Sequence, residues 1–153
     1  MIVDTNIALH LLDDRHPDSE QVTLAFALLS GTRDPVVNEI IFAETSLSFV
    51  SPEAVHAQFR ALGIVIDRLT LPECHHAGAA FRKYRRRGGP RQTILPDFLI
   101  GAQAAVGGWP ILTRDPKRFS SYFPEVEIID PMKVEARPSP PTASKAKPAN
   151  GRS

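Results

Sequence analysis

The chain has 153 residues, of which 18 are basic and 17 acidic, so its formal net charge at pH 7 is +1. This length suffices for one domain with a sizeable core, and the single cysteine, Cys74, excludes an intramolecular disulfide. No apolar run approaches the roughly 20 residues that span a bilayer, and no secretory signal pattern is visible at the N-terminus, so we expect a cytoplasmic protein without membrane segments.

Short β-branched runs alternate with segments of helical periodicity as far as residue 133. In chain order we expect strand 2–3, helix 5–13, helix 19–30, strand 36–37, helix 39–49, helix 51–63, strand 64–66, helix 71–89, helix 95–108, strand 109–115 and strand 126–130. Asn38 should cap the helix that follows it, and Pro116 should begin a turn. The alternation predicts an α/β fold with a central, mostly parallel sheet covered by helices on both faces.

The last part of the chain differs in composition. Residues 134–153 are rich in Pro, Ala, Ser and Lys and nearly lack bulky apolar side chains, so we expect a disordered tail after a folded domain at residues 1–133. Four of the basic residues and one acid lie in 135–153, which leaves 14 basic and 16 acidic residues, a net charge of −2, in 1–134. A polyanionic partner would therefore need a local basic patch.

Two acidic residues stand where predicted strands end. Asp4 follows the apolar run Met1 to Val3, and Asp115 ends the strand that begins near Trp109. Parallel sheets bind ligands outside the carboxyl ends of their strands, so these two carboxylates are expected to share one crevice.

Two more acids lie on helices in unusual places. Glu44 is predicted to fall on an apolar stripe between Ile40 and Leu47, where a carboxylate has no solvent to stabilise it. Asp97 begins an apolar helix of small residues, where an N-terminal acid or cap is the ordinary explanation. Each acid alone has such an ordinary account, but together the four suggest convergence.

Converging carboxylates repel one another by roughly 4 kcal/mol per pair at 4 Å and an effective dielectric of about 20. A divalent cation or proton uptake must relieve that repulsion. The candidate ligands are all oxygen atoms with no Cys/His set beside them, which favours Mg²⁺ or Mn²⁺ over zinc. Such a cluster suits phosphodiester cleavage, and Thr5, Asn6 and Thr113 could hold waters or phosphate oxygens beside it.

Four segments in this order, VDTN, NEIIFAE, LPDFLIGAQA and ILTRDP, resemble the motifs of PIN-domain ribonucleases, specifically the VapC-type toxins of bacterial toxin-antitoxin systems. The resemblance runs from Met1 to about Pro131 and omits the tail. It implies a three-layer α/β/α sandwich around a central, mostly parallel sheet. It further implies Mg²⁺- or Mn²⁺-dependent cleavage of single-stranded RNA, a homodimer, and inhibition by a cognate antitoxin.

The resemblance also assigns roles by motif position. Asp4, Glu44, Asp97 and Asp115 inherit the catalytic acidic positions. Of these, Asp4, Asp97 and Asp115 would bind the metal directly or through water. Glu44 would help orient the attacking water, with Thr5, Asn6 and Thr113 in support.

A basic segment, FRKYRRRGGPR, holds six cations in ten residues of an otherwise acidic domain. Cations at a helix C-terminus suit its dipole, but that accounts for only one or two of them. We therefore expect an edge that contacts RNA phosphates. The expected RNA-binding residues are Arg85, Arg86, Arg87, Arg91 and, after the last motif strand, Arg114.

Two alternatives stay open at this point. A haloacid-dehalogenase-like phosphatase would place a nucleophilic aspartate at Asp4, although that chemistry wants a second aspartate where Asn6 stands. A PIN fold kept as an RNA- or antitoxin-binding module would not cut at all. His10, His16 and His56 are isolated in the sequence and are given no role.

Overall fold

The structure is a computed structural model, and it describes residues 1–90 and 95–135. The predicted disordered tail therefore lies almost wholly outside the described residues. In chain order the elements are β1 (Ile2–Val3), α1 (Thr5–Leu12), α2 (Ser19–Ser30), β2 (Val36–Val37), α3 (Glu39–Ser46), α4 (Pro52–Ala61), β3 (Val65–Ile66), α5 (Leu71–Arg86), α6 (Leu95–Gly107), β4 (Ile111–Leu112), α7 (Pro116–Tyr122), β5 (Ile128–Ile129) and a short 3-10 helix (Pro131–Lys133).

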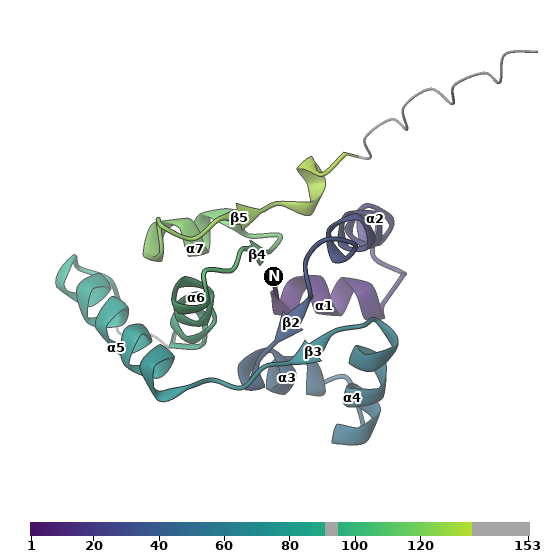
Figure 1. Cartoon of the computed structure of the whole chain (residues 1–153), viewed down its shortest axis with the longest axis horizontal. Helices are drawn as coiled ribbons and strands as arrows, with labels where there is room; N and C mark the ends of the chain where they lie inside the picture. The colour runs from purple at the N-terminus through teal and green to yellow at the C-terminus, as the bar shows by residue number, and fades with distance from the viewer. Residues whose placement is uncertain (91–94, 136–153) are drawn as a thin grey trace, which may run out of the picture.

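The five strands form one sheet in the order β3-β2-β1-β4-β5, and all four pairings are parallel. Figure 1 shows α1 and α2 on one side of this sheet and α5 and α6 on the other. The predicted α/β three-layer arrangement with a central parallel sheet is confirmed. Because every strand runs the same way, all five carboxyl ends meet at one edge, and β1 and β4 are neighbours there.

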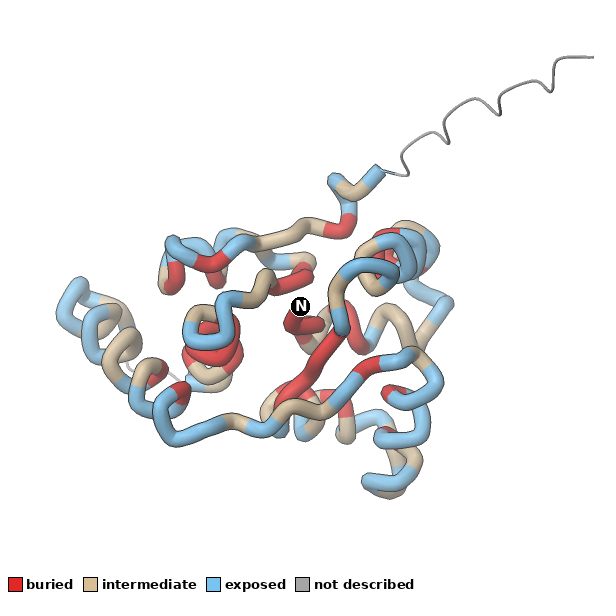
Figure 2. Tube along the Cα trace, in the orientation of Figure 1, coloured by how far each residue is buried: buried red, intermediate tan, exposed pale blue. Residues whose placement is uncertain are grey.

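The core lies where the central strands meet the two helical layers. Ile2, Val3, Val37, Ile111 and Leu112 are completely buried, as expected for a parallel sheet covered on both faces. Figure 2 shows buried segments at the centre of the molecule, between helices whose outer faces are exposed. By contrast, Val65 of the edge strand β3 is 57% exposed, because no strand pairs with its outer side.

Several elements differ from the sequence prediction, three of them beside the acidic residues. The strand expected over 109–115 is confined to β4, and the turn expected at Pro116 is the helix α7. Pro116 takes the first helical position, where its missing N–H is not needed, and the Asp115 carboxylate caps the helix by accepting the N–H of Arg118. Helix α3 ends at Ser46 rather than near Phe49.

The helix α6 is held to the sheet by a close contact and a buried polar network. A Cβ atom on Gly101 would lie 2.2 Å from the buried Phe123 ring, so only glycine permits this approach. The Nδ2 of Asn38 donates to Gln103 Oε1 at 3.0 Å, and Gln103 Nε2 donates to both the main-chain and side-chain oxygens of Asp67 at 3.1 Å. These contacts set the position of α6, and with it the position of Asp97 in its first turn.

Candidate active site

Asp4 is the centre of a polar cluster at the carboxyl end of β1. It is 1% exposed and forms the N-cap of α1, where Oδ1 accepts the main-chain N–H of Thr5 at 2.8 Å. Its Oδ2 accepts the Thr113 hydroxyl at 2.7 Å and the Asn6 amide at 2.9 Å. Burial raises the pKa of Asp4 above its ordinary value of 3.8, although Arg118 and these hydrogen bonds oppose that shift. A buried carboxylate in this environment favours a cation beside it.

The side chains of Asn6 and Thr113 connect Asp4 to the loop that follows β4. Asn6 Nδ2 donates to Thr113 Oγ1 at 3.2 Å, and Asn6 Oδ1 accepts the main-chain N–H of Arg114 at 3.1 Å. Thr113 Oγ1 also accepts the main-chain N–H of Asp115 at 3.0 Å. Of the three residues predicted to support the acids, Asn6 and Thr113 therefore contact Asp4 through their side chains and Thr5 through its main-chain N–H. Thr113 also holds Asp115 close to Asp4.

Glu44 reaches the same cluster from α3. Its Oε2 accepts the hydroxyl of Thr5, the residue that follows Asp4, and Glu44 itself is half-buried. The predicted apolar stripe around Glu44 is wrong, since Leu47 is 90% exposed and α3 ends before it. Glu44 is instead half-buried beside the N-terminus of α1, where it contacts Thr5.

Asp97 completes the cluster from the first turn of α6, where it is half-buried. Its pKa is raised first by burial, while Arg118 lowers it and the carboxylates of Asp4, Glu44 and Asp115 raise it further. The other three predicted acids therefore lie within electrostatic range of Asp97. Asp115 is the exposed member, at the N-terminus of α7.

Arg118 lies within this acidic cluster, and sequence reasoning missed it. Its Nη2 donates to Asp4 Oδ2 at 2.8 Å, and its Nε lies 3.5 Å from Asp97 Oδ2. The Nε–H is buried without a hydrogen-bond partner, so charge rather than hydrogen-bond geometry holds that side of the guanidinium. The available signal was the spacing of three residues from Asp115, which places Arg118 one turn into a helix that we predicted as a turn.

The set of donors fits a hard divalent cation. The acids and the side chains around them offer only oxygen ligands, and burial raises the pKa values of Asp4 and Asp97, so a cation bound beside them would favour their ionised forms. Among the residues that the structure describes, no three of these acids bring ligand atoms within 4.8 Å of one another. Arg118 lies between Asp4 and Asp97 and forms an ion pair with each.

The predicted RNA-binding arginines are spread over two places. Arg86 and Arg87 are exposed at the C-terminus of α5, whereas Arg85 Nη1 donates to the Gly89 carbonyl at 3.0 Å and helps to end that helix. Arg91 lies outside the described residues. Arg114 forms an ion pair with Asp18 at 2.7 Å, so its guanidinium is already engaged beside the acidic cluster. Exposed cations suited to phosphate thus lie mainly at the end of α5.

The family model described as PIN domain matches residues 1–122. No curated protein matched the chain. Among solved structures, the chain is similar to VapBC-1 from nontypeable Haemophilus influenzae, with a TM-score of 0.65, 18% identity and coverage of 86% of this chain and 98% of that one. DNA-bound VapBC from Salmonella typhimurium has a TM-score of 0.65 and 19% identity, with 85% and 96% covered.

A third similar structure is FitAcB from Neisseria gonorrhoeae, with a TM-score of 0.62, 20% identity and coverage of 87% of this chain and 99% of that chain. At these identities the likeness concerns the fold.

Within residues 1–90 and 95–135, no helix combines the length and the apolar character needed to cross a membrane.

Proposed function

Since this chain belongs to the PIN domain family, we propose that it is a metal-dependent endoribonuclease that cleaves single-stranded RNA as the toxin of a toxin-antitoxin pair. The observation that carries the proposal is the convergence of Asp4, Glu44, Asp97 and Asp115 at the carboxyl end of β1 and β4. The family match also favours this function over the phosphatase alternative.

Asp4, Asp97 and Asp115 would hold Mg²⁺ or Mn²⁺, directly or through water. The ion would lower the pKa of a bound water and neutralise charge that develops on the phosphate. Asn6 and Thr113 fix the orientation of the Asp4 carboxylate by hydrogen bonds to its Oδ2. Glu44, held by the Thr5 hydroxyl, would orient the attacking water.

The substrate would be bound through its phosphates. Arg86 and Arg87 are the exposed cations best placed for this on the described part of α5. Such contacts hold the RNA backbone without reading its sequence. The assignment of RNA rather than another phosphodiester comes from the family resemblance, and the experiment below tests it.

The proposal of a cognate antitoxin rests on the similar structures, which are described as VapBC and FitAB complexes and include forms bound to DNA. By the same resemblance we propose a homodimer. A catalytically inactive PIN module that binds RNA or antitoxin is favoured by one observation, the presence of Arg118 among the acids.

The test compares induced expression of the wild type, Asp97→Asn and the matched control Glu53→Gln, an exposed acid in the first turn of α4. Growth arrest and discrete RNA fragments are expected for the wild type and the control but not for Asp97→Asn. Purified protein should cut labelled single-stranded RNA with Mg²⁺ or Mn²⁺ and lose that activity in chelator. Equal behaviour of wild type and folded Asp97→Asn would refute catalysis and favour the binding module.

A further inference from the structure

A second group of potential ligands lies outside the acidic cluster. His10 on α1, His16 in the connection to α2 and Asp18 at the N-cap of α2 each offer an atom, and these atoms all lie within 4.8 Å of one another. It is the single such group of three among the described residues. The prediction that His10 and His16 are isolated is therefore wrong, because the turn between α1 and α2 brings the two rings to a centroid distance of 4.1 Å.

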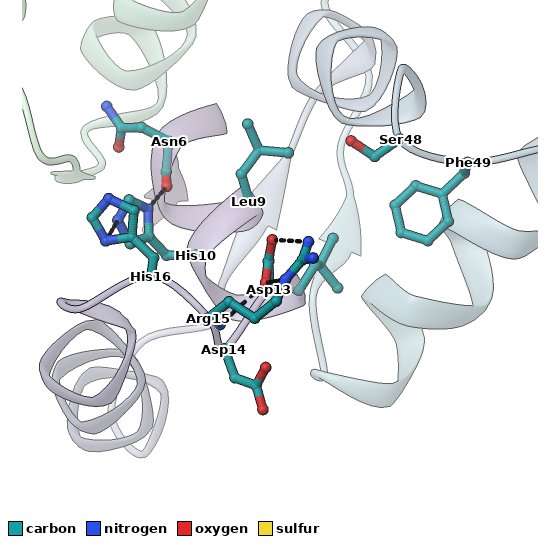
Figure 3. A pocket seen from close by; sticks show the side chains of 10 residues that line it. Asn6, Leu9, His10, Asp13, Asp14, Arg15, His16, Ser48 and Phe49 are labelled. Carbon is teal, nitrogen blue, oxygen red and sulfur yellow. Dashed lines mark hydrogen bonds and ion pairs between the residues drawn. The ribbon is translucent and has the colours of Figure 1, made fainter.

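The hydrogen bonds around the two rings determine where their lone pairs lie. The Asn6 carbonyl oxygen accepts from His10 Nδ1 at 2.5 Å, and because a carbonyl can only accept, Nδ1 carries a proton, which in the neutral ring leaves a lone pair on Nε2. The main-chain N–H of Asp18 donates to His16 Nδ1 at 3.3 Å, so this nitrogen carries no proton, and an ion bound to its lone pair would replace that long hydrogen bond. Figure 3 shows the two rings side by side, with His10 bonded to Asn6.

These two nitrogens, His10 Nε2 and His16 Nδ1, are 3.0 Å apart. Two lone pairs at this distance repel each other unless a positive charge lies between them. Two imidazole nitrogens bound to one tetrahedral zinc ion at about 2.0–2.1 Å lie roughly 3.3 Å apart, which is close to the spacing observed. The arrangement of the pair therefore resembles that of two ligands of one ion.

Asp18 supplies the third donor and the negative charge. Its Oδ2 accepts Arg114 Nη1 at 2.7 Å, while Oδ1 has no hydrogen-bond partner among the described residues. The carboxylate is thus oriented by Arg114, as the His10 ring is oriented by the Asn6 carbonyl. Ligands of a metal ion are commonly held in this way by hydrogen bonds on the side away from the ion.

From these contacts we infer that His10, His16 and Asp18 form a binding site for Zn²⁺ or a similar borderline divalent ion, separate from the acidic cluster. Two imidazole nitrogens and one carboxylate select such an ion over Mg²⁺, which prefers oxygen. Three protein ligands leave a fourth position for water. The two histidines also line a cavity of about 740 Å³, which gives the ion access from solvent.

Binding at this site would clamp the connection between α1 and α2. His10 belongs to α1, whereas His16 and Asp18 belong to residues 13–18, which carry no regular secondary structure. An ion that binds only the folded arrangement stabilises it. Zinc should therefore raise the melting temperature by several degrees, without requiring any RNA or nuclease activity.

The test measures Zn²⁺ affinity by competition with a chromophoric chelator, using tag-free protein in excess Mg²⁺. The wild type should bind one zinc per chain, and His16→Ala should bind at least about 100-fold more weakly, since loss of a ligand exceeds the effect of losing an outer contact. The matched control His56→Ala removes an exposed histidine on α4 and should bind like the wild type. Asp4→Asn should also retain the zinc.

Substitution with Co²⁺ supplies a second readout, because the visible absorption bands of a four-coordinate ion should appear in the wild type and vanish in His16→Ala. His10→Gln must produce the same loss, and melting curves in chelator establish that both variants fold. Absence of stoichiometric zinc would overturn the inference and leave a shared proton between the rings. Equal affinity of His16→Ala, or loss of zinc in Asp4→Asn, would overturn it as well.

Discussion

Replacement of Arg118 with alanine removes the cation that lies between Asp4 and Asp97. Its guanidinium is 2.8 Å from Asp4 Oδ2 and 3.5 Å from Asp97 Oδ2, while its side chain is 31% exposed. A divalent ion held by Asp4 and Asp97 would compete with this group for their carboxylates. We therefore expect Arg118→Ala to lose stability without metal and to bind Mg²⁺ or Mn²⁺ more tightly than the wild type.

The two distances set the magnitude. At an effective dielectric of about 20, they correspond to gross attractions of about 6 and about 5 kcal/mol, most of which desolvation of the ions offsets. Breaking a fully buried ion pair costs about 3–5 kcal/mol, and the partial exposure of Arg118 reduces the expected loss to about 1–3 kcal/mol. If only about 1.4 kcal/mol of this is recovered on metal binding, the affinity for the ion rises tenfold.

The assay is thermal unfolding across a titration of MgCl₂ or MnCl₂, for the wild type, Arg118→Ala and the control Arg33→Ala. Arg33 is similarly exposed and pairs with Glu127 at 3.5 Å, on a different part of the molecule. The variant at Arg118 should unfold at a lower temperature without metal and gain more from it, with its midpoint at a lower metal concentration. An unchanged midpoint would show that Arg118 does not compete with the ion and would refute this reasoning.

Three further predictions concern the acids, the packing of α6 and the basic segment. Because burial raises the pKa of Asp97 above 3.8, the ionised Asp97 carboxylate destabilises the fold. Asp97→Asn should therefore be as stable as the wild type or more stable at pH 7. Urea unfolding should show that this gain disappears as the pH falls below the pKa of Asp97 in the folded protein. Gly101→Ala should lose about 1–3 kcal/mol against the Phe123 ring, whereas Gly78→Ala, at an exposed helical site with open space, should gain up to about 1 kcal/mol in the same denaturation assay. Replacement of Arg86 and Arg87 with glutamine should weaken RNA binding and reduce its salt dependence by about 0.7 per lost phosphate contact, while Arg60→Gln on α4 should change neither.

The alternation of short apolar runs with helical periods was sufficient to predict the parallel sheet and its covering helices. The same pattern placed Asp4 and Asp115 after strands that turned out to be neighbours, β1 and β4. It also identified Asn38 as a cap, and its side chain does accept the N–H groups of Ile40 and Ile41. These features are local or follow from the direction of the strands, so sequence carries them. The catalytic roles of the acids and the boundary of the domain at residue 133 stay predictions.

What only the tertiary structure decided is which side chains meet across distant segments. Arg118 enters the acidic cluster because Pro116 starts a helix, and Gln103 bridges Asn38 and Asp67 although nothing in its own segment marks it. The apolar stripe predicted around Glu44 is wrong, and Glu44 reaches the cluster through Thr5 instead. His10 and His16 meet because a six-residue turn reverses the chain. Periodicity reports how one element faces its surroundings, whereas these contacts depend on the packing of several elements at once.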